Sequence, residues 1–282
     1  MKRIGTETAA RAILYIETHL SERLDLETVA EAAHYSKYHL HRMFTEAAGI
    51  TLHDYIRRRR LTAAAKLLVF SEMSVMDIAL AAGYESRQAF TDMFKAMYKQ
   101  TPGKYRAGKR FYPLQLELDL EFGPPAHGAV VPDISRASGE DVPAWLAFAS
   151  QVVRDFPGYQ EEEHLERLND QIRKRQAFLM RDRGLVVGAA AFSRETGDVD
   201  FLGVLPRYRR RGVEKAFLDC LPRDREIHIT TFRADDRADT GQRRDLLELG
   251  FSPAELLTEY GYPTQRLVLP AGRRDRREGE AT

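Results

Sequence analysis

A duplicated segment constrains the fold of this chain more than any other feature of its 282 residues. Residues 29–55 recur at 78–105, with an offset of 49 positions before a short turn and 50 after it, so that Tyr35 matches Tyr84. Glu85 is the extra residue that absorbs the change of offset. Because self-similarity at a fixed spacing marks a repeated supersecondary unit, the first part of the chain is predicted to contain one unit twice.

Each copy has the pattern of a short helix, a tight turn and a second helix that begins after a serine. Apolar residues recur at three- and four-residue spacing, which is typical of helices. Gly83 supplies the left-handed residue that the second turn needs, and His34 stands at the matching position of the first. Ser36 and Ser86 are predicted to cap the second helices. This is a helix-turn-helix layout, in which the exposed start of the second helix enters the major groove of DNA.

The second helix of each copy has an apolar face, expected in the core, and a polar face, expected to meet DNA. The candidate DNA-binding residues are Lys37, Tyr38, His41 and Arg42 in the first copy and Arg87, Gln88, Thr91 and Lys95 in the second.

A longer helix, residues 51–70, is predicted to join the two copies rigidly. Four consecutive arginines, 57–60, lie within it. They could form an ordinary solvent-exposed face, or they could contact phosphates, which adds affinity without sequence information. The sequence leaves both interpretations open. The candidate phosphate contacts are Ser36, Arg57, Arg58, Ser86 and Lys104.

The distribution of charge separates the two parts of the chain. Residues 1–110 carry 18 Lys and Arg against 12 Asp and Glu, whereas the remainder carries 25 against 30, within a net charge of +1. A basic region beside an acidic one fits a nucleic-acid-binding module joined to a domain of another kind.

Over residues 8–108 the chain resembles the DNA-binding domain of the AraC/XylS family of bacterial transcription regulators. The resemblance rests on 33–44, on 77–84, and on the Pro-x-x-Tyr-Arg pattern at 102–106. It implies two helix-turn-helix units that read successive major-groove segments of double-stranded DNA, and it implies RNA polymerase as a partner. A role as activator is expected for the family, and the sequence leaves activation and repression both open. By that resemblance the base-reading residues are Tyr38, His41 and Arg42 in one groove and Arg87, Gln88 and Thr91 in the next.

One position departs from the family pattern. Asp92 stands where family members often carry arginine. A carboxylate near DNA phosphates is unfavourable unless it accepts a hydrogen bond from a cytosine amino group. The second copy is therefore predicted to bind DNA less strongly than the first.

The pattern of the chain changes near Phe111. Residues 114–122 alternate apolar and polar side chains, which predicts a half-buried strand, and a Gly- and Pro-containing linker follows. Beyond it, strand patterns alternate with helix patterns, which indicates an α/β or α+β domain. The predicted strands are 177–181, 185–192, 198–205, 226–231 and 265–269, and the predicted helices are 141–155, 161–175, 213–221 and 241–249.

The expected chain is thus a multidomain protein. An all-α domain with two helix-turn-helix units occupies 1–110, a strand and linker 111–128, and the α/β (α+β) domain 129–270. The charged, apolar-poor tail at 271–282 is predicted to be disordered.

A basic loop between a strand and a helix is the candidate ligand site of the second domain. The pattern Arg209-x-x-Gly212-x-Glu214 spans the predicted start of a helix near Val213, where free backbone amides could bind a phosphate. Such a loop could also be an ordinary basic surface loop. The order of elements, with Leu-Gly-Phe at 249–251, resembles the GNAT acetyltransferase fold over about 129–270. The resemblance implies acetyl-CoA as a candidate ligand and Asp200 as a candidate catalytic base. The implied ligand-binding residues are Val204, Leu205, Arg209, Arg210, Arg211, Gly212 and Val213.

Two departures from the GNAT pattern weaken the case for catalysis. Glu214 replaces a small residue beside the expected pyrophosphate, and Leu246 stands where active members often place a tyrosine acid. The leading hypothesis is a sequence-specific DNA-binding transcription regulator whose GNAT-like domain senses a small molecule or an acyl-CoA. The alternative is an N-acetyltransferase that uses acetyl-CoA on a small amine, with the helical domain giving DNA targeting or regulation.

Other classes of protein are disfavoured by composition. No apolar run approaches the length of a membrane span, and the N-terminal residues carry charges that a secretory signal lacks. Cys220 is the single cysteine, which excludes an intrachain disulfide, and neither the three nearby histidines at 34, 39 and 41 nor the acidic run 235–239 completes a metal-binding pattern. The sequence predicts a cytoplasmic protein with no metal and no membrane partner.

Overall fold

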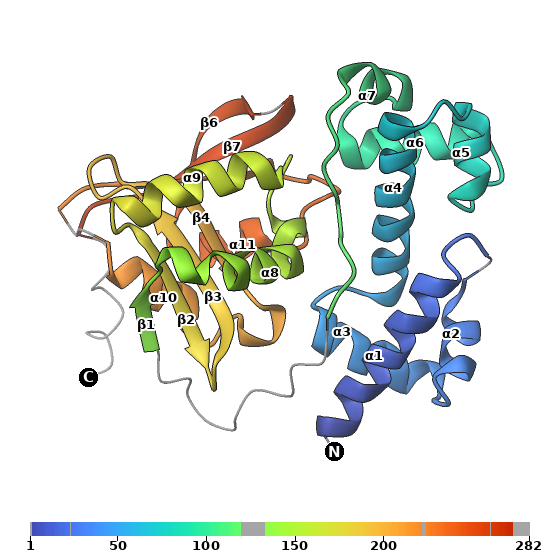
Figure 1. Ribbon diagram of the computed structural model, residues 1–282, viewed down its shortest axis with the longest axis horizontal. Coiled ribbons are helices and arrows are strands. Elements are labelled where there is room, and N and C mark those ends of the chain that lie inside the picture. The colour runs from blue at the N-terminus through green and yellow to red at the C-terminus, as the bar shows by residue number, and fades with distance from the viewer. Residues whose placement is uncertain (1, 23, 120–132, 222–223, 260, 273–282) are drawn as a thin grey trace. The chain divides into compact units, whose positions relative to one another are not determined.

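The computed structural model describes residues 2–22, 24–119, 133–221, 224–259 and 261–272. Contacts divide the chain into two compact units, which Figure 1 shows with their elements labelled. Unit 1 comprises Met1–Pro125, Gly158–Gln160 and Asp236–Thr240, and unit 2 comprises Ala126–Pro157, Glu161–Asp235 and Gly241–Thr282. Apart from its first two residues, the tail predicted to be disordered lies outside the described residues.

Unit 1 is helical, as the sequence predicts. The pairs α2–α3 and α5–α6 are the two copies of the repeat, and α4 joins them (Figure 1). The helices are α1 (Lys2–Thr18), α2 (Leu26–Ala32), α3 (Lys37–Ala48), α4 (Leu52–Phe70), α5 (Val75–Ala81), α6 (Arg87–Tyr98) and α7 (Pro102–Gly108).

The turns and caps of the two copies confirm the predicted local geometry. His34 has a φ of 62° and Gly83 a φ of 75°, so both turns use the left-handed region. The hydroxyls of Ser36 and Ser86 each accept a hydrogen bond from the backbone N–H three residues on, at 3.4 and 3.2 Å. Each serine thereby ends the turn and begins a helix whose first N–H groups would otherwise be unpaired.

The cores beneath the two copies differ in composition. Around the first copy, buried aliphatic side chains such as Ile13, Val29 and Leu40 surround Phe44. Around the second, Phe94 stacks on Tyr98 with ring centroids 4.4 Å apart and meets Tyr105 edge-on at 5.3 Å. Such ring pairs stabilise a core beyond the apolar area that they bury.

The strand predicted at 114–122 is wrong over its described part, residues 114–119. These residues form an extended segment bound to α4 instead of a sheet. The Leu114 N–H donates to Thr62 Oγ1 at 3.1 Å, and the Leu118 N–H donates to the Tyr55 hydroxyl at 3.4 Å. An extended chain that lies on a helix alternates its side chains as a strand does, so the two cannot be told apart by periodicity. Residues 120–128, which complete the predicted strand and linker, lie outside the described residues.

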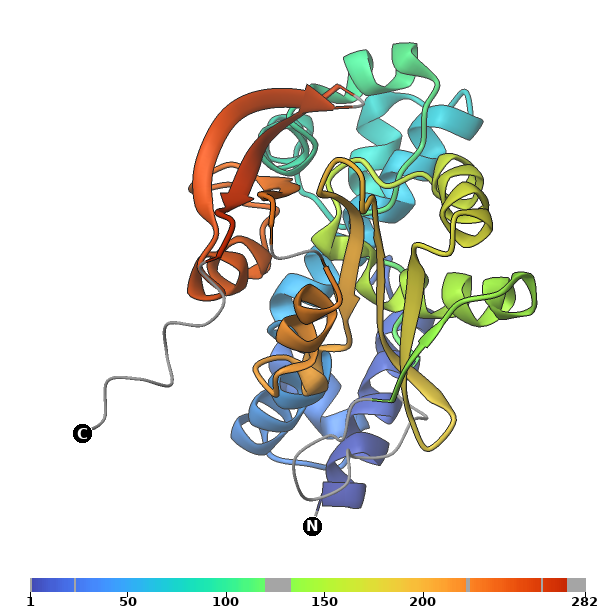
Figure 2. The ribbon, with the colours of Figure 1, turned by 90° about the vertical axis from the view of Figure 1, so that its left-hand side faces the viewer.

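Unit 2 is a mixed-sheet domain with helices, which confirms the predicted class. Its seven-stranded sheet has the order β1-β2-β3-β4-β5-β7-β6. Figure 2 shows β6 and β7 as one curved hairpin at the orange-red end of the colour scale. The strands are β1 (Asp133–Arg136), β2 (Ala177–Asp182), β3 (Leu185–Phe192), β4 (Asp198–Val204), β5 (Ile227–Phe232), β6 (Ser252–Glu259) and β7 (Tyr262–Leu269). The helices are α8 (Val142–Val152), α9 (Glu161–Arg173), α10 (Val213–Asp219) and α11 (Gln242–Glu248), with 3-10 turns η1 (Gly139–Asp141), η2 (Val153–Asp155) and η3 (Pro206–Tyr208).

The parallel pair β4 and β5 separates soon after it begins. Asp198 pairs with His228 and Val199 with Ile229, and no later pair joins these strands within the described residues. The buried Thr231 hydroxyl of β5 instead donates to the Gln242 side chain of α11 at 2.7 Å. The separation leaves the carboxyl half of β4 beside a cleft.

Candidate nucleic-acid interface and ligand cleft

The helix α3 presents the first set of predicted DNA-binding residues on one exposed face. Leu40 and Phe44 are buried, which fixes the rotation of the helix, and Tyr38 is 80% exposed. Lys37, His41 and Arg42 are exposed as well. Cations and an aromatic ring that project from the start of a second helix suit contacts with base edges and phosphates. The individual base contacts stay predictions.

The helix α6 presents the second set, with an added restraint. Arg87, Gln88 and Lys95 are exposed and Thr91 is half-buried. The Gln88 amide donates to both carboxylate oxygens of Asp92 at 3.0 Å. A glutamine amide reads adenine through the same N–H group that Asp92 holds here. The residue that departs from the family pattern thus holds the side chain of a predicted base-reading residue.

The serines and the lysine predicted to contact phosphate lie at helix starts. The hydroxyls of Ser36 and Ser86 already accept cap hydrogen bonds, and Lys104 is exposed in the first turn of α7. Phosphate contact by these three residues stays a prediction.

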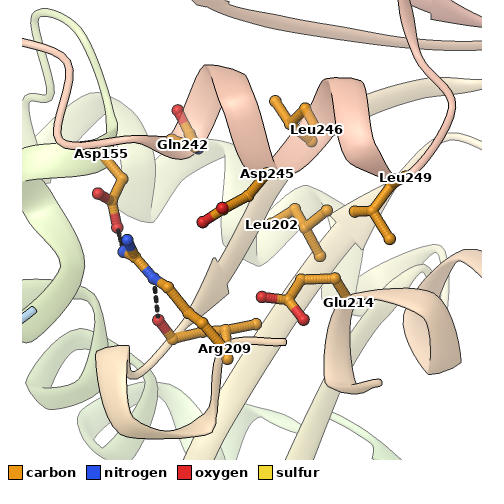
Figure 3. Close-up of a pocket in the computed structure, with 9 residues that line it drawn as sticks. Asp155, Leu202, Arg209, Glu214, Gln242, Asp245, Leu246 and Leu249 are labelled. Atoms are coloured by element: carbon orange, nitrogen blue, oxygen red, sulfur yellow. Dashed lines mark hydrogen bonds and ion pairs between the residues drawn. The ribbon is translucent and has the colours of Figure 1, made fainter. Parts of the chain in front are cut away.

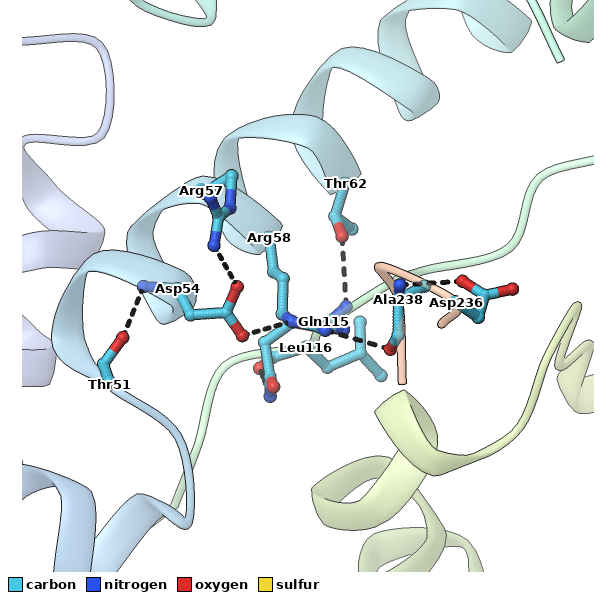
Figure 4. Close-up of polar contacts among 9 residues, drawn as sticks. All are labelled: Thr51, Asp54, Arg57, Arg58, Thr62, Gln115, Leu116, Asp236 and Ala238. Carbon is cyan, nitrogen blue, oxygen red and sulfur yellow. Dashed lines mark hydrogen bonds and ion pairs between the residues drawn. The ribbon is translucent and has the colours of Figure 1, made fainter. Parts of the chain in front are cut away.

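The phosphate contact predicted for Arg58 is wrong, because Arg58 is buried. Its side chain is 1% exposed, and Figure 4 shows it between α4 and residues 236–238. Arg58 Nε lies 2.7 Å from Asp54 Oδ2, and Arg58 Nη2 donates to the Ala238 carbonyl at 2.9 Å. Burial alone would raise the pKa of Asp54, but the charge of Arg58 and hydrogen bonds from Arg57 and Arg58 hold it below its usual value. A buried guanidinium paired in this way is part of the core of unit 1.

The other arginines of the run are also engaged within unit 1. Arg57 donates to Asp54 at 2.6 Å and stays partly exposed, so its phosphate contact remains a prediction. Arg59 forms an ion pair with Glu17 at 2.5 Å. Arg60 donates to the Leu20 carbonyl at 2.9 Å. The run 57–60 is therefore neither a solvated face nor a row of free phosphate contacts, since it ties α4 to segments on both sides of it.

A cleft in unit 2 lies where β4 and β5 separate (Figure 3). Its empty space is about 350 Å³ when the open solvent at its mouth is included. Charged side chains from the loop after β4 and from α11 face aliphatic ones across it. The lining residues are Asp155, Leu202, Val204, Arg209, Glu214, Gln242, Asp245, Leu246 and Leu249.

The arginines predicted to bind a ligand are bound to carboxylates of unit 2. Arg209 forms an ion pair with the buried Asp155 and also donates to the Val204 carbonyl at 3.4 Å (Figure 3). Arg210 donates to Asp245 at 3.1 Å. Arg211 is exposed. Two of the three cations of the predicted loop are thus neutralised before any ligand arrives.

The remaining predicted ligand-binding residues could contact a ligand through backbone groups more than through side chains. The side chains of Val204, Leu205 and Val213 are buried, and Gly212 has a φ of 84° directly before α10. Glu214 lies in the wall of the cleft, where burial raises the pKa of its carboxyl against the opposing charge of Arg209.

Asp200, the one predicted catalytic residue, does not line this cleft. Asp200 accepts a hydrogen bond from Gln171, and partial desolvation raises the pKa of its carboxyl. Leu246 lines the cleft with an aliphatic chain that donates no proton. The role of Asp200 as a base stays a prediction without a partner acid.

Two searches of the described residues complete the survey. Within them, no group of three or more His, Cys, Asp or Glu side chains is placed to hold a metal ion. Among the same residues, no helix has the length and apolar character that a membrane crossing requires.

Comparison with known proteins identifies the class of unit 1. A family model described as a helix-turn-helix domain matches residues 29–108. The probable transcription factor PqrA of Proteus vulgaris is 44% identical over 94 residues, which cover 33% of this chain and 77% of PqrA. The transcriptional activator AarP of Providencia stuartii is 40% identical over 100 residues, which cover 36% of this chain and 74% of AarP. The chain belongs to the AraC/XylS family of DNA-binding transcription regulators.

Longer relatives match over a smaller share of their length. The transcriptional regulator YbfP of Bacillus subtilis is 42% identical over 112 residues, which cover 39% of this chain and 38% of YbfP.

Two solved structures are similar to separate parts of the chain. A solved GNAT-family acetyltransferase from Bacillus cereus has 14% identity and a TM-score of 0.39, covering 51% of this chain and 99% of that one. The solved DNA-binding domain of AdpA in complex with a target DNA has 29% identity and a TM-score of 0.34, covering 35% and 89%.

Proposed function

We propose that this regulator is a transcription activator that reads two successive major-groove segments through α3 and α6 and acts on RNA polymerase. The observation that carries the proposal is the pair of serine-capped helices, each with a buried apolar face and an exposed face that holds the predicted DNA-binding residues. The names of AarP and PqrA, an activator and a transcription factor, support the same role. Two linked readers need a site whose segments lie about 10 base pairs apart.

A binding-site selection with the full chain tests this proposal. Random duplexes selected over several rounds should converge on one motif with two segments about one helical turn apart. Affinity measured by fluorescence anisotropy should fall steeply as salt rises, because bound cations displace counterions from phosphates. No enriched motif, or a motif with a single short segment, would contradict the proposal.

The proposal for unit 2 is a GNAT-like domain that senses a small molecule or an acyl-CoA. It is supported by the separation of the parallel strands β4 and β5, by the cleft beside α11, and by the loop that precedes α10. The charges of the cleft do not fit the pyrophosphate of a CoA. Arg209 and Arg210 are already paired with carboxylates, and Glu214 places a further carboxyl group in the wall. A small molecule without that diphosphate is the better match to these residues.

Calorimetric titration with acetyl-CoA separates the two ligand classes. The unchanged protein should bind acetyl-CoA weakly, and Glu214→Gln should tighten binding by about tenfold because it removes the carboxylate at nearly constant volume. Asp219→Asn, an exposed change on the same helix, is the matched control. Tight binding that Glu214→Gln does not improve, together with acetyl transfer to a small amine, would favour the acetyltransferase alternative instead.

A further inference from the structure

A short segment from the second half of the sequence completes unit 1. Asp236–Thr240 belongs to unit 1 by its contacts, although it follows β5 and precedes α11 along the chain. Asp236 Oδ1 lies 2.7 Å from Lys99 Nζ, at the end of α6. The carbonyl of Ala238 accepts the hydrogen bond from Arg58 of α4 (Figure 4). One segment therefore contacts both the joining helix and the second reading helix.

The groups that make these contacts are withdrawn from solvent. The side chain of Asp236 is 3% exposed and that of Lys99 22%. Asp236 Oδ1 also accepts the Ala238 N–H at 2.8 Å, so the carboxylate that holds Lys99 also shapes the turn that presents the carbonyl to Arg58. A desolvated ion pair with further hydrogen bonds fixes its partners far more strictly than an exposed pair, which water and side-chain entropy loosen.

The residue that ends α6 differs from the one at the matching position of the first copy. Lys99 ends α6 with a φ of 61°, and at the matching position of the first copy Gly49 ends α3 with a φ of 72°. Glycine is the preferred residue there, because a β-carbon makes the left-handed conformation costly. The ammonium group of Lys99 binds the Ala96 carbonyl at 2.7 Å as well as Asp236.

We propose that residues 236–240 position α6 relative to α4, so that the second reader stands at the spacing that two successive DNA segments require. Asp236 and Lys99 are then positioning residues for DNA recognition, and they act through α6 without touching DNA. The proposal rests on the two-reader function proposed above. It predicts that losing the Asp236–Lys99 pair weakens binding only where both readers must engage the same duplex.

Two duplexes and full-length variants test the positioning role. One duplex carries both selected segments, and the other has the second segment scrambled. Asp236→Asn and Lys99→Gly should each weaken binding to the two-segment duplex by about tenfold, and should leave affinity for the other within about twofold. Asp235→Asn, an exposed neighbour, is the matched control and should change neither.

The paired variants separate positioning from simple charge and from misfolding. Asp236→Asn removes a negative charge and Lys99→Gly a positive one, so a shared loss of affinity cannot come from long-range attraction to phosphates. Lys99→Gly relieves the left-handed strain but leaves the buried Asp236 carboxylate without its cation, so the stability of each variant to urea is measured beside its DNA affinity. Lys99→Arg, which keeps a cation at this position, should retain two-segment binding within about twofold.

Two results would overturn the positioning role. One is unchanged two-segment affinity in both single variants, and the other is an equal loss on both duplexes. If the unchanged protein binds the two duplexes equally well, the two-reader function itself is wrong. This outcome is distinct from failure of the positioning role, because it is measured without any variant.

Discussion

In the first helix-turn-helix copy, α3 exposes Tyr38 and Arg42, whereas in the second copy Asp92 occupies the position that matches Arg42 and binds the Gln88 amide. The capping serines and left-handed turns of the two copies remain equivalent. Duplication has thus kept the backbone, whose geometry depends on local hydrogen bonds, while the reading surfaces have diverged. We therefore expect the first copy to contribute more of the affinity for DNA than the second.

The cores under the two copies diverge in the same way. Phe44 and Phe94 occupy matching positions and both are fully buried. Phe44 meets Tyr55 at a centroid distance of 5.6 Å, whereas Phe94 contacts three aromatic neighbours, including Tyr98 at 4.4 Å. The matched phenylalanine of the second copy thus has more ring pairs around it than that of the first.

The largest expected effect comes from removing these matched rings. Phe94→Ala should lower the free energy of unfolding by about 3–5 kcal/mol, through lost burial and the cavity left behind. Phe44→Ala, its matched control, should cost about 1–3 kcal/mol less, because it loses two fewer ring pairs. Urea unfolding followed by circular dichroism measures both. Equal costs would show that the aromatic cluster adds nothing beyond burial.

Arg42→Ala should have the largest effect on DNA recognition by the first copy. Loss of a bidentate base contact costs about 1–3 kcal/mol and relaxes specificity at one position of the motif. Arg136→Ala removes the same charge from an exposed site on β1 and should leave the motif unchanged. Anisotropy with a panel of singly substituted duplexes reports both effects. A uniform loss on every sequence would reassign Arg42 from base reading to phosphate contact.

Asp92→Arg converts the second copy toward the family pattern. The change frees the Gln88 amide and adds a cation near phosphate, so affinity should rise by about tenfold at low salt, with a salt dependence steeper by about one counterion. Glu140→Arg, an equal change of charge at an exposed site in unit 2, is the control. If Asp92→Arg weakens binding to the selected motif, Asp92 itself reads a base, as a carboxylate does with cytosine.

The smallest expected effect lies in the two turns. His34→Gly should stabilise the protein by about 0.5–1 kcal/mol, because glycine adopts the left-handed conformation without the cost of a β-carbon. Gly83→Ala should destabilise it, since the new β-carbon would also lie 2.9 Å from the Arg60 guanidinium. Denaturant midpoints measure both changes. If Gly83→Ala stabilises the protein, the left-handed conformation is not required in the turns of both copies.

Much of the candidate DNA interface could be predicted from sequence, because its signals are local. A serine that caps a helix, a left-handed turn and an apolar face at helical spacing each involve residues within a few positions of one another. The same holds for β2 to β5, whose patterns predict their positions to within about two residues. β6 was missed because its exposed side chains follow no alternation that marks a buried face.

Only the tertiary structure shows which charged side chains form ion pairs within the fold and which remain exposed. Arg59 finds Glu17, Arg209 finds Asp155, and Lys99 finds Asp236, each from a distant part of the sequence. No local sequence pattern encodes such partners. The arginines at 57–60 and in the loop after β4 therefore could not be assigned from sequence either to ion pairs within the fold or to binding of DNA or a ligand. The sequence by itself determined the duplicated unit and the mixed-sheet class, since hydrogen bonds and periodicity over short stretches specify them. The engagement of 57–60 and the inclusion of Asp236–Thr240 in unit 1 required the folded chain, because burial and ion pairing depend on what long-range packing brings together.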